Sequence, residues 1–262
     1  IPRMEWSGKN ELVVQQLNRK QQESKLIYCN VTDGKARIFW AENSQAWVDL
    51  NAADPKGWNW INNGKEFIWV SEKDGWRHIY KISRNGNAEI VLTTGAYDIE
   101  EIKCIDEVNN LIYFTASPFN ATQLYLYKVN IQKPSLLKRI FNGSNITKEA
   151  FDPVNANGRE GIHGYQISPN GKFAFHTYSN HNTPRVQEWL KLPANTPLNQ
   201  AKSIEATAKT DSKVDVEFVK IQTDDQITLN AWINKPKNFD STKKYPVVLY
   251  VYGEPAASTV VD

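Results

Sequence analysis

The stretch that decides the fold is WINNGKEFIWV, residues 60–70. An apolar start leads into Asn63-Gly64, and an apolar run at 67–70 follows the turn. Asn-Gly favours a tight hairpin turn because both residues tolerate the positive φ that such a turn requires. The stretch therefore predicts two antiparallel strands joined by a short turn.

The same turn-then-strand pattern recurs along the chain. Similar stretches occupy residues 6–14, 106–114 and 168–175, and a second strand pattern follows each of them. The period is roughly 45–60 residues, enough for about four short strands per unit, which is typical of a β-propeller blade. One blade cannot bury both of its faces, so the units must stack. We predict a mainly β protein whose residues 1–213 form a partial β-propeller of about four blades, each a four-stranded antiparallel sheet.

Residues 214–262 depart from this repeat. The segments 216–222 and 227–233 alternate apolar and polar residues and predict an antiparallel hairpin, and a polar loop over 235–244 follows. The run YPVVLYVYGEP at 245–255 then predicts a strand buried on both faces, as in a parallel sheet flanked by helices. Such a strand needs neighbours and a crossover helix. We therefore expect a cut chain that ends in the truncated beginning of a second domain and also lacks residues before Ile1.

Composition excludes several classes of protein. Hydrophobic residues make up 40% of the chain, enough for a sizeable core, and the net charge of +2 gives no bias toward nucleic acid or anionic membranes. No apolar run is long enough for a membrane helix, and the first residues have no signal-peptide core. The two cysteines, Cys29 and Cys104, are too few for a disulfide scaffold, and we expect buried free thiols.

The C-terminal stretch resembles a known family. The hairpin ending in Lys235-Pro236, the segment 243–246, the apolar run and the Tyr-Gly-x-Pro turn at 252–255 are similar to the start of the α/β-hydrolase domain of prolyl oligopeptidase-type serine peptidases. The closest likeness is to the dipeptidyl peptidase IV family. Residues 161–179 are similar to the last propeller blade of that family, and residues 58–80 to an earlier blade.

The resemblance implies a function for the whole protein. It implies a serine exopeptidase that releases N-terminal dipeptides from peptides, with a preference for Xaa-Pro, in which the propeller gates and orients the substrate. The implied partners are peptides with proline at the second position, with no nucleic acid, no metal and no organic cofactor. A homodimer and an extracytoplasmic location, periplasmic or at the cell surface, are implied in the same way.

Tyr252 is the candidate catalytic residue. By resemblance its hydroxyl donates to the oxyanion of the tetrahedral intermediate, and acyl transfer does need a preorganised donor at that place. The family usually has a small residue where this chain has Glu254, which puts the shape of the loop in doubt. No G-x-S-x-G nucleophile motif is present, and in this fold Ser, Asp and His follow the oxyanion strand. We therefore expect the triad to lie beyond Asp262 and this chain alone to be inactive.

Other polar residues favour structural roles. Glu100-Glu101 would attract a peptide ammonium group, but the pair lies in a blade-strand pattern, and the amine-binding pair of the family is expected upstream. Arg77 is expected to pair with a carboxylate, or to extend from its blade toward solvent, rather than to contact substrate. Structural or solvent-exposed roles are also expected for all four histidines, which lack metal-ligand spacing: His78, His163, His176 and His181.

Two alternatives stay open at this point. The first is a non-catalytic propeller that binds a peptide or a protein, because fold does not fix function. The second is another peptidase of the prolyl oligopeptidase clan. The parent sequence beyond Asp262 would separate the first alternative from the peptidase.

Overall fold

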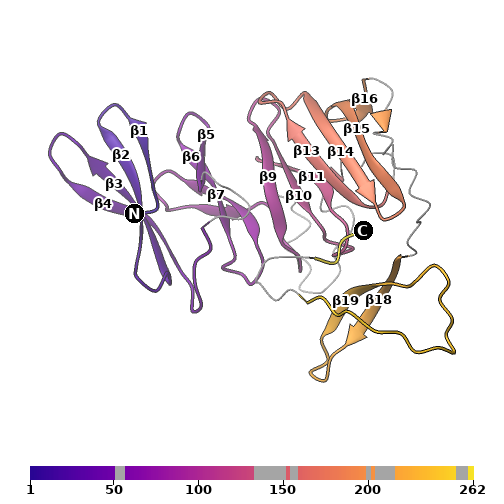
Figure 1. Ribbon diagram of the computed structural model, residues 1–262. Helices are drawn as coiled ribbons and strands as arrows, with labels where there is room; N and C mark the ends of the chain where they lie inside the picture. Colours follow the sequence, from indigo (N-terminus) through magenta and orange to yellow (C-terminus); the bar gives the residue numbers. More distant parts are fainter. Residues whose placement is uncertain (51–56, 133–151, 154–158, 199–201, 204–215, 252–258) are drawn as a thin grey trace.

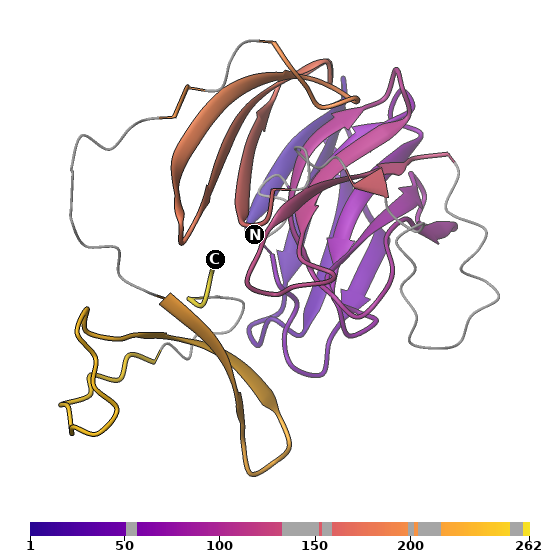
Figure 2. The same ribbon diagram turned by 90° about the vertical axis from the view of Figure 1, so that its right-hand side faces the viewer.

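The computed structural model describes residues 1–50, 57–132, 152–153, 159–198, 202–203, 216–251 and 259–262. Within these ranges the regular secondary structure is entirely β, in four antiparallel sheets followed by one hairpin. The four sheets lie side by side in chain order, from indigo to orange, in Figure 1. In Figure 2, which is turned by 90°, the first three sheets overlap and the fourth, in orange, lies beside them. The predicted four blades of antiparallel sheet are therefore confirmed.

Each sheet is built from consecutive strands. The first sheet contains β1 (Arg3–Gly8), β2 (Glu11–Leu17), β3 (Glu23–Asn30) and β4 (Ala36–Asn43). The second contains β5 (Trp58–Ile61), β6 (Glu66–Ser71), β7 (His78–Ser83) and β8 (Glu89–Val91). The third contains β9 (Ile99–Asp106), β10 (Leu111–Ala116), β11 (Tyr125–Asn130) and β12 (Asp152–Pro153). The fourth contains β13 (Ile162–Ile167), β14 (Phe173–Asn180), β15 (Thr183–Lys191), β16 (Thr196–Pro197) and β17 (Lys202–Ser203).

Strand alternation explains how the sheets stack. On β6, Phe67 and Trp69 face the first sheet, whereas Ile68 between them belongs to the core shared with the third sheet. On β11, Leu126 packs toward the fourth sheet and Tyr127 toward the second. Successive side chains of a strand point to opposite faces, so each inner blade supplies two cores. The hydrophobic core is accordingly split into three layers, one between each pair of neighbouring sheets.

The turn at Asn63-Gly64 has the backbone conformation that its sequence predicts. Asn62, Asn63 and Gly64 have φ values of 52°, 54° and 75° between β5 and β6. The guanidinium of Arg84 donates a hydrogen bond to the carbonyl oxygen of Gly64 at 3.0 Å. Asparagine and glycine occupy this left-handed region at low cost, which is why the sequence marks the turn.

The segment after the fourth sheet is partly as predicted. Thr196–Pro197 and Lys202–Ser203 both pair with β15 and complete the fourth sheet. The hairpin is confirmed as β18 (Val216–Gln222) and β19 (Thr228–Asn234). The predicted boundary between residues 213 and 214 lies outside the described residues and stays a prediction.

The expected buried strand after the hairpin is wrong for the described residues 246–251. They form no strand, and Val247 and Val248 are 86% and 96% exposed. A strand of a parallel sheet needs at least one hydrogen-bonded neighbour, and no described residue pairs with this run. Within the described ranges there is also no helix that is long and apolar enough to cross a membrane.

Candidate functional site at the junction of the third and fourth sheets

The chain returns to the propeller after the predicted oxyanion stretch. Tyr252 itself lies outside the described residues, so its role stays a prediction. The four residues 259–262 are described, and they end at the junction between the third and fourth sheets. Asp262 is the residue of this segment that binds both sheets.

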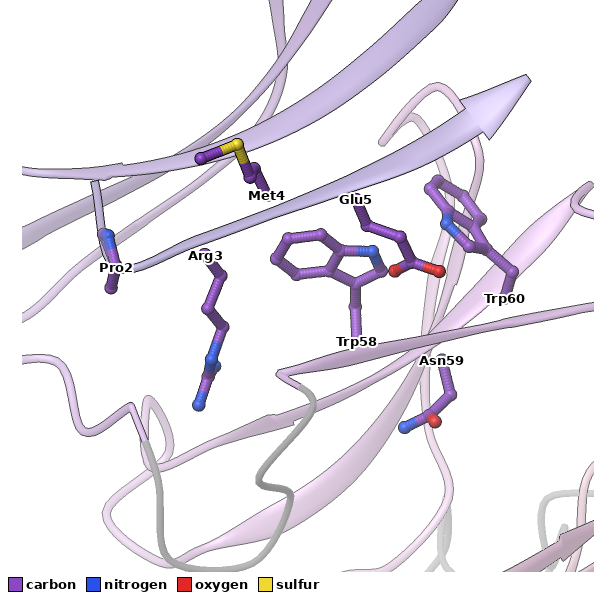
Figure 3. A pocket seen from close by; sticks show the side chains of 7 residues that line it. All are labelled: Pro2, Arg3, Met4, Glu5, Trp58, Asn59 and Trp60. Atoms are coloured by element: carbon purple, nitrogen blue, oxygen red, sulfur yellow. The ribbon is translucent and has the colours of Figure 1, made fainter. Parts of the chain in front are cut away.

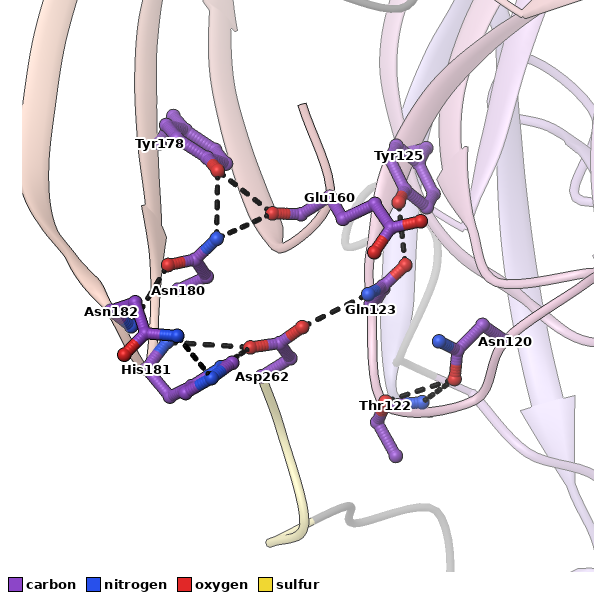
Figure 4. Close-up of polar contacts among 10 residues, drawn as sticks. All are labelled: Asn120, Thr122, Gln123, Tyr125, Glu160, Tyr178, Asn180, His181, Asn182 and Asp262. Atoms are coloured by element: carbon purple, nitrogen blue, oxygen red, sulfur yellow. Dashed lines mark hydrogen bonds and ion pairs between the residues drawn. The ribbon is translucent and has the colours of Figure 1, made fainter. Parts of the chain in front are cut away.

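Asp262 makes hydrogen bonds to two turns from different blades (Figure 4). Its backbone N–H donates to the carbonyl oxygen of Thr122 at 2.7 Å, and its Oδ2 accepts from the side-chain amide of Gln123 at 3.0 Å. Both partners precede β11 of the third sheet. On the other side, Oδ1 accepts from the backbone N–H of His181 at 3.3 Å and also from its Nδ1. His181 lies in the turn between β14 and β15 of the fourth sheet.

Neighbouring side chains fix the orientation of both donors. The hydroxyl of Tyr125 donates to Oε1 of Gln123 at 2.6 Å, which leaves the amide nitrogen of Gln123 facing Asp262. The amide nitrogen of Asn182 lies 2.6 Å from Nε2 of His181. Because an amide nitrogen only donates, Nε2 must accept, and the ring proton of His181 sits on Nδ1 toward Asp262. The neutral tautomer of His181 is therefore sufficient for the contact.

Burial and hydrogen bonding compete at this carboxylate. Gln123 is only 6% exposed, and the Asp262 side chain is 12% exposed. Burial raises the pKa of Asp262, but the hydrogen bonds from His181 and Gln123 outweigh it and leave that pKa below its usual range. Burial raises the pKa of Tyr125, and the nearby charges of Glu160 and Asp262 raise it further. The site thus holds an ionised carboxylate beside a neutral phenol.

A second polar group is buried between the same two sheets. Nδ1 of His163 lies 2.9 Å from Nε2 of His176, whose Nδ1 lies 2.9 Å from Oε1 of Glu188. The guanidinium of Arg159 also reaches Glu188, at 2.8 Å. His163, His176 and Glu188 are 1%, 0% and 2% exposed. Burial lowers the pKa of His163 to about 4. We refer to these three residues as the histidine row.

A cavity opens between the first strands of the first and second sheets (Figure 3). It has a volume of about 600 Å³, within the range of small-molecule sites, and is lined by Pro2, Arg3, Met4, Glu5, Trp58, Asn59 and Trp60. The carboxylate of Glu5 points toward the two indole rings in Figure 3. The Nε1 atoms of Trp58 and Trp60 are buried and have no hydrogen-bond partner among the described residues. The cavity thus combines aromatic walls with one guanidinium and one carboxylate.

Arg77 and His78 have the structural roles that the sequence predicts. The buried guanidinium of Arg77 forms ion pairs with Asp49 at 3.1 Å and with Glu72 at 2.7 Å. His78 lies in β7, with Nε2 at 3.1 Å from the carbonyl oxygen of Gly95. The predicted pairing of Arg77 with a carboxylate is confirmed.

The remaining candidates also lie in blade strands or turns. Glu100 and Glu101 are in β9, where Glu101 pairs with Lys103 and Glu100 lies at a bulge in the pairing with β10. Both cysteines are free, but only Cys104 is buried, whereas Cys29 is half-buried. The expectation of two buried thiols is therefore wrong for Cys29. Among the described residues, no group of three or more His, Cys, Asp or Glu could hold a metal ion.

Sequence reasoning missed the partners of Asp262 and the histidine row. Alternation along β13 and β14 does place His163 and His176 on buried faces, and that signal was available. The register that sets Glu188 opposite His176 could not be predicted, because it depends on the length of the β14–β15 turn. Nothing in the sequence connects Asp262 with Gln123, which lies 139 positions earlier.

Comparisons with known proteins agree on one family. The model of the dipeptidyl peptidase IV N-terminal region matches residues 1–185. Among curated proteins, the probable dipeptidyl peptidase 4 of Trichophyton verrucosum is 25% identical over 258 residues, covering 97% of this chain and 32% of that protein. The probable dipeptidyl peptidase 4 of Emericella nidulans is 26% identical over 259 residues, covering 95% of this chain and 31% of that protein.

Solved structures share the fold. The dipeptidyl peptidase 4 of Porphyromonas gingivalis superimposes with a TM-score of 0.79 at 23% identity, covering 97% of this chain and 33% of that one. A putative dipeptidyl aminopeptidase IV from Bacteroides ovatus has a TM-score of 0.76 at 22% identity, covering 98% of this chain and 37% of that one. The chain thus spans about a third of the length of the curated relatives it matches.

Proposed function

Because the chain belongs to the dipeptidyl peptidase IV family, we propose that the full-length protein is a serine peptidase that releases dipeptides from peptide N-termini, preferring proline at the second position. The family match over residues 1–185 carries this proposal, and the curated relatives named dipeptidyl peptidase 4 support it along nearly the whole chain. The substrates would be peptides.

In this proposal the two parts of the chain have different tasks. Residues 1–213 form propeller blades that gate and orient the peptide, and residues 214–262 begin the α/β-hydrolase domain. Tyr252 donates its hydroxyl to the oxyanion, and the Ser-Asp-His triad lies beyond Asp262. Serine catalysis of this type needs no metal or organic cofactor. A homodimer and an extracytoplasmic location complete the proposal.

The test is hydrolysis of a chromogenic Xaa-Pro dipeptide reporter by the full-length protein. We expect release from the reporter with a free N-terminus and none from the N-acetylated reporter, because an exopeptidase of this kind must bind the amine. Release from both reporters would favour another peptidase of the clan. No release from either would leave the non-catalytic binding propeller as the function.

The role of Tyr252 needs its own variant. Tyr252→Phe removes one oxyanion donor and is expected to lower kcat by about 10²–10³-fold with little change in KM. Tyr250→Phe, two residues earlier in the same apolar run, is the matched control and should keep full activity. Equal kcat values for Tyr252→Phe and Tyr250→Phe would show that Tyr252 is not a catalytic residue.

A further inference from the structure

We propose that Asp262 is a docking point that ties the chain segment after Tyr252 to the propeller, and that Gln123 and His181 are the positioning residues that hold it. Asp262 follows Tyr252 by ten residues. The kinetic part of this inference rests on the proposed peptidase function. The docking itself does not, because it can be measured in the absence of activity.

The contact is specific because each hydrogen-bonding group of Asp262 has its own partner. The backbone N–H reaches Thr122, one carboxylate oxygen reaches Gln123, and the other reaches His181. The partners come from two turns on neighbouring blades, so Asp262 also bridges the third sheet to the fourth. Hydrogen bonds to an ionised group that is largely withdrawn from water are stronger than those of an exposed ion pair.

Hydrogen bonds within the propeller hold the two turns that bind Asp262. Asn120 Oδ1 accepts hydrogen bonds from the backbone N–H and hydroxyl of Thr122, at 3.1 and 2.9 Å, and holds this turn in place. Tyr125 orients Gln123, and Asn182 sets the tautomer of His181. The donors are therefore aimed at one point without any reorganisation, as a binding site for a carboxylate requires.

A second segment from beyond the propeller meets the same histidine. The ring of Phe218 on β18 lies 5.4 Å from the ring of His181, in an edge-to-face arrangement. His181 thus contacts both the hairpin and the segment 259–262, which in the proposed function belong to one hydrolase domain. The turn at His181 would therefore hold that domain at a fixed position relative to the propeller.

The sharpest variant is Asp262→Asn in the full-length protein. The new amide nitrogen would face the amide nitrogen of Gln123, and Gln123 cannot turn over without losing its bond from Tyr125. Turning the new amide instead would set it against the donor on His181. We expect hydrogen exchange of the 259–262 segment to accelerate at least tenfold and kcat for the Xaa-Pro reporter to fall about tenfold, with KM changing less.

The partner variants test the same contact from the propeller side. Gln123→Leu and His181→Ala should reproduce the faster exchange. His181→Asn should restore slow exchange, because its amide nitrogen is as many bonds from Cα as Nδ1 and can donate to Asp262. The matched control is Gln166→Leu, an exposed glutamine on β13, which should change neither readout.

The outcomes separate the two proposals. If the wild-type protein cleaves the reporter but Asp262→Asn and Gln123→Leu leave both exchange and kcat unchanged, the docking point is overturned. If the wild-type protein cleaves nothing while exchange still responds to these variants and recovers in His181→Asn, the docking stands and the peptidase function fails.

Discussion

His163 and His176 lie in contact between the third and fourth sheets, with Nδ1 of the first 2.9 Å from Nε2 of the second. The other nitrogen of His163 is 2.9 Å from the carbonyl oxygen of Arg159, and that of His176 is 2.9 Å from the carboxylate of Glu188. Each of these three contacts needs one proton if it is to be a hydrogen bond. Two neutral imidazoles and a carboxylate carry only two protons, so in that state one of the contacts is not a hydrogen bond.

Burial and the nearby charges decide how the histidine row is protonated. Burial lowers the pKa of both rings, to about 4 for His163. The hydrogen bond to Glu188 opposes this effect for His176, and the charge of Glu188 opposes it for His163, but both pKa values stay below the usual range. His163 is therefore neutral near pH 7, with its proton on Nε2 toward the carbonyl oxygen of Arg159.

The first prediction concerns acid stability. His163 stays neutral in the folded chain down to a pKa of about 4, whereas an unfolded histidine binds a proton near pH 6.5. The native state then holds fewer protons in this range, so the contribution of His163 is complete above about pH 6.5 and is lost as pH falls toward 4. The full loss is about 3 kcal/mol, by 1.36 kcal/mol per pKa unit.

Urea unfolding between pH 7.5 and 4.5, followed by tryptophan fluorescence, measures this slope. His163→Gln keeps a donor at the position of Nε2 but cannot titrate, so its stability should depend less on pH over the same range. An identical slope in the variant would mean that His163 does not carry the effect.

The second prediction tests the contacts of Glu188 with His176 and Arg159. Glu188→Gln removes the charge that offsets the burial of His176 and leaves Arg159 unpaired. Removing one partner of a buried pair costs about 3–5 kcal/mol, and the partial exposure of Arg159 reduces this to about 2–3 kcal/mol. The free energy of unfolding is the measurement, and Glu160→Gln is the control, because this side chain is exposed. Equal stability of the two variants would show that these contacts of Glu188 do not stabilise the fold.

The third prediction isolates a steric contact between the first two sheets. Gly86 and Gly34 have nearly the same backbone, with φ of 76° and 70°. A Cβ on Gly86 would lie 1.9 Å from the carbonyl oxygen of Phe39, whereas a Cβ on Gly34 meets nothing within 4 Å. Both alanine variants bear the left-handed strain of about 1–2 kcal/mol.

Gly86→Ala should therefore lose at least a further 1–3 kcal/mol, because β4 must move to admit the methyl group. Because both variants carry the same backbone strain, the difference between their melting temperatures reports the contact with Phe39 alone. A difference near zero would show that the turn at Gly86 can shift away from Phe39 at no cost.

The fourth prediction concerns the two thiols. Cys104 is 9% exposed, and burial raises its pKa, so little thiolate is available to react. Cys29 is half-buried on the face of the first sheet that points away from the second. A thiol reagent on the folded chain should first add one adduct, which Cys29→Ser abolishes and Cys104→Ser leaves. A first adduct on Cys104, located by peptide mass, would contradict the burial order.

The sequence alone determined the repeat, the hairpins and the turn residues. These depend on local rules: alternation places Phe67 and Ile68 on opposite faces, and Asn63-Gly64 fixes a turn by its backbone preference. The pairing of Arg77, which directly precedes β7, was also predicted, since a guanidinium withdrawn from water needs a carboxylate nearby. The family resemblance also came from local motifs, and the family match confirms it.

The tertiary structure alone decided which distant residues meet. Residues 246–251 are apolar enough for a buried strand, yet they are exposed in the described chain, because a parallel strand exists only where neighbours bind it. The histidine row depends on strand register, and the contact of Asp262 with Gln123 and His181 depends on how two turns from different blades come together. Local preference fixes the elements of this protein, whereas long-range packing fixes its polar sites, because no local pattern encodes the distance between two turns.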